Sequence, residues 1–155
     1  MALTLDSNLN FDPEAQAKKI YAKKLVEQGE QFDQEGKIDK ALAQFQSALA
    51  LDSSLKISAG SWNKLCWNGS LYGYANKVMN ACEKAVKLAP KDENIRDSRA
   101  LARALTGDIQ GAIKDFQFAI ENYGSEEFKK ERQAWVTALQ KGENPFTKEV
   151  LEGLR

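Results

Sequence analysis

A short apolar motif occurs three times in this chain of 155 residues, and it constrains the fold more than any other feature. In each copy, a small or short apolar residue is followed four positions later by Phe or Cys, and three positions after that by Ala and an aliphatic residue. The copies begin at Ala41, Val78 and Ala112, which are 37 and 34 residues apart. Residues three, four and seven apart share one helix face. The motif therefore predicts a repeated helix whose alanines let a neighbouring helix approach closely.

A period near 34 residues with this motif is typical of the tetratricopeptide helix-turn-helix, whose consensus is W-x2-L-G-x2-Y, then A-x3-F, then P. In this register the copies span residues 22–55, 59–92 and 93–126, with an insertion at residues 56–58. Each copy keeps a different part of the consensus. The first has Gly29, Phe32, Ala41, Phe45 and Ala48, the second has Trp62, Leu65 and Pro90, and the third has Ala112, Phe116 and Ala119. The chain resembles tetratricopeptide repeat proteins, which implies an all-α fold, a right-handed superhelical stack of three helix pairs.

Capping residues predict where the helices begin and end. Asp12 before Pro13 predicts a helix start ahead of the first copy, and Gly36 predicts its end. Later N-caps are expected at Asp92, Asp108, Ser125 and Thr147. The predicted organisation is a tail at residues 1–12, three repeats with an N-terminal helical extension at 13–126, and C-terminal capping helices at 127–155, which cover the last repeat.

Two runs carry a narrower resemblance. They are Arg96–Arg99, continued by Ala102–Asp108, and Gly111–Phe116; the closing segment Asn144–Thr147 fits the same group. Together they look like repeat domains of bacteria, cyanobacteria especially, that often end larger proteins carrying an NTPase or a beta-propeller sensor. The resemblance implies protein–protein interaction and leaves open whether the chain stands alone.

Composition excludes several classes of function. Lys and Arg number 22 and balance 22 Asp and Glu, so no overall field attracts nucleic acid or an acidic membrane. No apolar run is long enough to span a membrane, and the N-terminus lacks the pattern of a signal peptide. We therefore expect a cytoplasmic, reducing setting.

The chain has no histidine, which removes His-based acid–base catalysis and most zinc sites. Cys66 and Cys82 are interpreted as two small buried hydrophobes. A redox pair is the alternative, which their spacing does not exclude. We expect no enzymatic activity, no cofactor and no metal.

The resemblance implies that the first helix of each pair lines a concave groove. The groove residues carried over to this chain are Lys23, Val26, Glu30, Asn63, Trp67, Asn94, Asp97 and Leu101. Asp33, Gly60, Ser70 and Ala104 hold further positions on the same faces. Trp67 is additional to the consensus Trp62, so it is a candidate anchor for a peptide. Alternatively, Trp67 packs under the N-terminal helix or the insertion.

Charged side chains suggest two further surfaces. Arg96, Arg99 and Arg103 share one helix face, as an anion clamp for a carboxylate or phosphate would require; the alternative is ion pairing with nearby acids or the C-terminal helices. The middle copy has five basic and two acidic residues, or a net +3, with Lys77, Lys84 and Lys87 on one helix. A solvated face is favoured there over a patch for an acidic partner.

These features predict a non-enzymatic module that binds a peptide or protein segment in its groove. The module is expected to bind neither nucleic acid nor a membrane. The alternative is a structural role, in which the chain self-associates as a homo-oligomer or docks onto a larger signalling assembly while its groove is filled intramolecularly.

Overall fold

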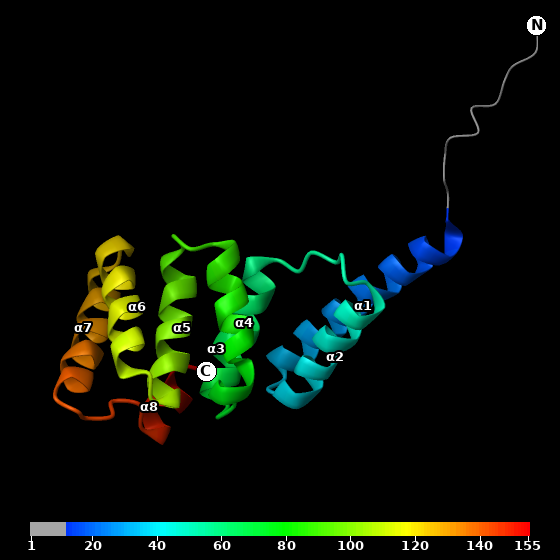
Figure 1. The fold of residues 1–155 in the computed structure, drawn as a ribbon. Coiled ribbons are helices and arrows are strands. Elements are labelled where there is room, and N and C mark those ends of the chain that lie inside the picture. Colours follow the sequence, from blue (N-terminus) through cyan, green and yellow to red (C-terminus); the bar gives the residue numbers. More distant parts are fainter. Residues whose placement is uncertain (1–11) are drawn as a thin grey trace, which may run out of the picture.

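The fold is a row of antiparallel helix pairs, seen in a computed structural model that describes residues 12–155 (Figure 1). The predicted tail, up to Phe11, lies outside the described residues. The pairs are α1 (Pro13–Gln34) with α2 (Ile38–Leu51), α3 (Ala59–Leu71) with α4 (Ala75–Leu88), and α5 (Glu93–Thr106) with α6 (Ile109–Asn122). The remaining helices are α7 (Glu126–Gln140), which packs on α6, and the short α8 (Lys148–Gly153).

The predicted caps are confirmed. The Asp12 carboxylate accepts hydrogen bonds from the backbone of Glu14 and Ala15, and Asp92 does the same at the start of α5. Asp108, Ser125 and Thr147 cap α6, α7 and α8. Side-chain caps satisfy N–H groups that the first helical turn leaves unpaired, so these boundaries are set locally.

The core consists of two clusters. The first extends from α1 through α4 to one side of α5 and contains Phe45 and Trp62, whose ring centroids are 5.1 Å apart. The second centres on Phe116, Trp135 and Phe146, so α7 and the segment after it cover the apolar face of the third helix pair. Within the second pair, a Cβ at Gly69 would lie 2.3 Å from Val78 Cγ1, so only glycine permits this approach of α3 to α4.

The C-terminal segment turns back along the stack. In Figure 1, α8 lies below α5 and the chain ends beside α3. The Arg155 guanidinium donates a hydrogen bond of 2.9 Å to the Leu71 carbonyl and lies over the Tyr72 ring. None of the helices within residues 12–155 has both the length and the apolar character that a membrane span requires.

Candidate peptide-binding groove

A hollow lies between α1, the link that precedes α3 and the start of α3, and Lys23 and Val26 are the predicted groove positions that line it. Lys23, Val26 and Ser61 border a space of about 270 Å³. Lys23 is exposed, while Val26 is partly buried against the first core cluster. The Glu30 carboxylate accepts a hydrogen bond from the Ser61 hydroxyl, which ties α1 to α3 at this place. The hollow therefore offers apolar surface and charge to a ligand.

A buried carboxylate closes the inner end of this face. Asp33 is 1% exposed, and one of its oxygens accepts a hydrogen bond of 2.7 Å from the Asn68 amide on α3. Within residues 12–155 the other oxygen, Asp33 Oδ1, has no hydrogen-bond partner, and neither does Asn63 Oδ1. Burial raises the pKa of Asp33 to about 6, although the Asn68 hydrogen bond and the charge of Lys64 act in the opposite direction.

Trp67 of α3 lies between the groove positions of α1, which are accessible, and those of α5, which are mostly covered. It is partly buried and packs against the second core cluster, which Leu151 and Leu154 of the C-terminal segment also contact. Its packing partners thus lie toward the C-terminus rather than in the N-terminal helix or the insertion. The residue is not fully buried, so its role as an anchor stays a prediction.

The groove positions of α5 are mostly covered. Asp97 is 4% exposed and receives two hydrogen bonds from Arg132 of α7, at 3.0 and 2.9 Å. Burial raises the pKa of Asp97, opposed by Arg132. Leu101 is completely buried in the second cluster, whereas Asn94 is exposed. The helix that follows the third pair therefore occupies the space in which a ligand would meet α5.

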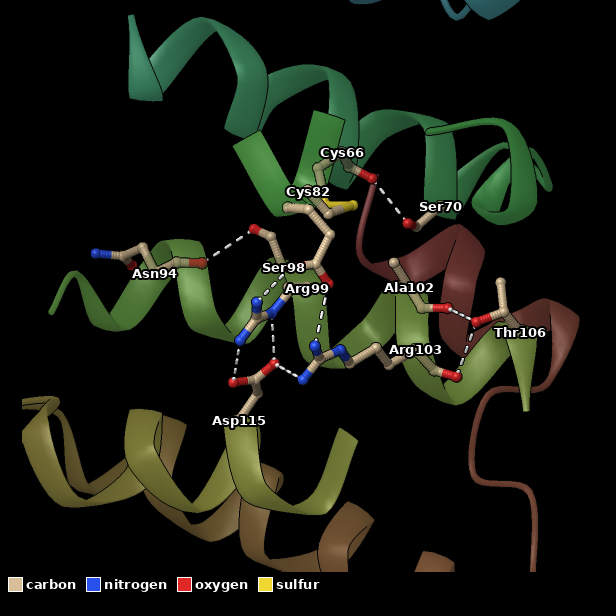
Figure 2. Close-up of a disulfide and its surroundings, with 11 residues drawn as sticks. Cys66, Ser70, Cys82, Asn94, Ser98, Arg99, Ala102, Arg103, Thr106 and Asp115 are labelled. Atoms are coloured by element: carbon tan, nitrogen blue, oxygen red, sulfur yellow. Dashed lines mark hydrogen bonds and ion pairs between the residues drawn. A yellow bond between two sulfur atoms is a disulfide. The ribbon is translucent and has the colours of Figure 1, made fainter. Parts of the chain in front are cut away.

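The three arginines of the predicted anion clamp converge on Asp115 of α6. Figure 2 shows two of them, Arg99 and Arg103, beside Asp115. The Arg99 guanidinium donates to both Asp115 oxygens, at 2.7 and 2.9 Å, and Arg103 donates to one of them at 2.9 Å. Arg99 and Arg103 also contact Glu83 of α4, and Arg103 lies 3.5 Å from Asp108. Three guanidinium groups thus face three carboxylates. The anion clamp stays a prediction, but an external anion would have to displace these partners.

The two cysteines form a disulfide between α3 and α4 (Figure 2). The prediction that both are buried is confirmed, with 0% and 1% exposure, but their interpretation as unlinked hydrophobes is wrong. In the first helix pair the same repeat positions hold Gly29 and Phe45, where a Cβ on the glycine would lie 2.6 Å from the ring. The disulfide occupies this close helix contact. Disulfides are uncommon in reducing compartments, so the bond argues against the predicted cytoplasmic setting.

Comparisons with known proteins agree on the fold class, which is that of the tetratricopeptide repeat. The chain superposes on the crystal structure of the P58(IPK) TPR domain with a TM-score of 0.64 and 21% identity, over 83% of this chain and 36% of that one. In sequence it is 26% identical over 123 residues to DnaJ homolog subfamily C member 3 of Gallus gallus. That match covers 79% of this chain and 24% of the relative. No family model matches the chain.

Proposed function

We propose that this chain is a non-enzymatic module that binds a peptide or protein segment in the groove lined by α1 and α3. One observation carries the proposal: Lys23 and Val26 line a hollow of about 270 Å³, and Asn63 and Trp67, further along α3, keep accessible surface. The third helix pair contributes little, because α7 and the C-terminal segment cover its groove positions. The bound segment is therefore short, and Trp67 marks its far end.

A specific observation favours the alternative, in which the groove is filled intramolecularly and the chain self-associates or docks onto a larger assembly. Leu151, Leu154 and Arg155 pack against the end of α3 and the cluster that includes Trp67. In this case the C-terminal segment competes with a ligand. Deleting residues 148–155 would then increase binding or self-association, measured by sedimentation velocity. Under the groove proposal the deletion leaves binding at α1 and α3 unchanged.

The groove proposal is tested by affinity capture with three baits: wild type, Trp67→Ala and Phe118→Ala. Phe118 is a matched control, because it is also a partly buried aromatic residue but lies on α6. A hot-spot aromatic residue contributes about 2 kcal/mol or more to binding. We expect proteins that wild type and Phe118→Ala retain and Trp67→Ala loses, with similar melting temperatures of the two variants. Equal capture by all three would contradict the proposal.

A further inference from the structure

A second hollow lies between the first two helix pairs, at the ends of α2 and α4. It has a volume of about 500 Å³, nearly twice that of the hollow at α1. Its apolar side chains come from four elements: Leu49, Leu55, Ile57, Trp62 and Leu88. Leu88 is 57% exposed and contributes the most open part of this apolar lining. This surface is apolar and remains open to solvent.

The hollow exists because the link between these helix pairs is long. Residues 52–58 join α2 to α3, whereas only residues 89–92 join α4 to α5. The longer link contains the insertion at 56–58, and α2 makes few contacts with α3, while α4 packs closely on α5. Leu55 and Ile57 of the link form one wall of the hollow and also border the smaller hollow at α1. The insertion thus keeps the two helix pairs apart and provides a binding surface.

The charge around the hollow has one sign. Its remaining lining residues are Lys56, Lys84 and Lys87, and no carboxylate lines it. In the described part of the chain, none of these three lysines forms a salt bridge. Lys84 Nζ lies 4.3 Å from the centroid of the Trp62 ring, a cation–π contact that holds this ammonium group at the rim. Three cations without a carboxylate partner around an apolar floor favour an anionic, partly apolar ligand.

We propose that this hollow binds an acidic segment of a partner protein that inserts one large apolar side chain. The apolar side chain would cover Leu88 and Trp62, and the flanking carboxylates would pair with the lysines at the rim. An extended chain fits better than a lipid tail, because the hollow is an open notch between helix pairs rather than an enclosed cavity. This surface adjoins the hollow at α1, with which it shares Leu55, Lys56 and Ile57, but Trp67 does not line it. It uses the positive charge of the middle repeat.

The test is selection of nine-residue peptides from a random phage-displayed library on the full chain. Each selected peptide is then measured by fluorescence polarisation against Lys84→Glu/Lys87→Glu and Leu88→Ser. The control is Lys114→Glu/Lys130→Glu, which reverses two exposed lysines away from the hollow. We expect peptides with Asp or Glu around one Phe, Trp, Leu or Met. The double reversal should weaken their binding about tenfold or more, and the control and Trp67→Ala should leave it unchanged.

Several results would overturn the proposal. They are the selection of no peptides, selection of peptides without acidic and apolar residues, or binding that the three substitutions in the hollow do not alter. Concentration-dependent dimerisation of wild type that Leu88→Ser abolishes would identify a second copy as the occupant instead. Co-sedimentation with phosphatidylglycerol vesicles that Lys84→Glu/Lys87→Glu abolishes, without peptide binding, would identify a membrane surface. The groove proposal fails separately, when Trp67→Ala captures the same proteins as wild type.

Discussion

The second and third helix pairs are each held together by a different kind of interaction between their two helices. In the second pair, Cys66 and Cys82 are joined covalently. The third pair has Ala100 and Phe116 at the corresponding positions and adds the arginine cluster around Asp115. A disulfide is indifferent to charge but depends on the redox environment, whereas buried ions are stable only while each charge has its partners. Neighbouring copies of one repeat thus respond to different conditions.

Asp115→Ala tests the ionic side of this comparison and should have the largest effect. The substitution leaves Arg96, Arg99 and Arg103 facing one another without their shared carboxylate, and Arg99 is itself buried. Removing one partner of a buried ion pair destabilises by about 3–5 kcal/mol. Urea unfolding measures the loss, and Lys114→Ala is the control at an exposed neighbour. A change of less than about 1 kcal/mol, within the usual range of surface substitutions, would show that the cluster does not hold the third pair together.

Reduction of the disulfide tests the covalent side. The bond closes a loop with a sequence separation of 16 residues. A loop of this length contributes about 3 kcal/mol through the entropy of the unfolded chain. A reductant should therefore lower the melting temperature of wild type and have no effect on Cys66→Ala/Cys82→Ala. Two free thiols per native chain in the absence of reductant would contradict the disulfide itself.

Asp33→Asn extends the comparison to a buried carboxylate without an ion pair. The pKa of Asp33 in the folded chain, about 6, lies above its ordinary value of 3.8, so the folded chain holds the proton more tightly than the unfolded one. Stability is therefore lost as pH rises from about 4 to 6 and stays lower above that range. Asparagine keeps an acceptor for Asn68 without the charge. At pH 7.5 the variant should therefore be more stable, by at most about 3 kcal/mol for a pKa raised from 3.8 to about 6.

The pH profile of unfolding separates this effect from others. Between pH 4 and 7 the Asp33→Asn variant should lose less stability than wild type, while Glu121→Gln, at an exposed acid, should follow wild type. If the free energy of unfolding changed with pH in the same way for all three proteins, ionisation of Asp33 would not destabilise the folded chain.

Lys77→Ala should have the smallest effect. The Lys77–Asp39 pair joins α4 to α2 at 2.7 Å, but both side chains are more than half exposed. Exposed pairs contribute little, because water and salt screen the attraction. We expect no measurable shift of the urea midpoint. A shift comparable to that of Asp115→Ala would show that burial does not distinguish the two kinds of ion pair.

The sequence was sufficient to predict helices whose ends are set locally. Asp12, Asp92 and Asp108 cap the helices that their positions predict, since a cap depends on residues only two or three positions away. The stack of helix pairs was also predictable, because the small residues of the repeat leave few other ways to bury its apolar stripe.

The side-chain pairings were not predictable, because they depend on how separate helices face one another. The three arginines indicated an acidic neighbour, but only the contact between α5 and α6 selects Asp115. The spacing of Cys66 and Cys82 allowed either a bond or two free thiols. The pairing of Arg132 with Asp97 of α5 was also missed. The signal was its spacing, because Arg132 lies four residues after Phe128 and three before Trp135, on the same helix face.

Site-specific photo-crosslinking tests the central claim, that a partner segment binds along α1 and α3. A benzophenone amino acid replaces Lys23, an exposed groove position, or Ala43, an exposed position on α2. The account predicts covalent adducts with a partner protein from position 23 and none from position 43, and loss of these adducts when Trp67→Ala is added. Adducts from position 43 alone, or adducts from position 23 that survive Trp67→Ala, would contradict it.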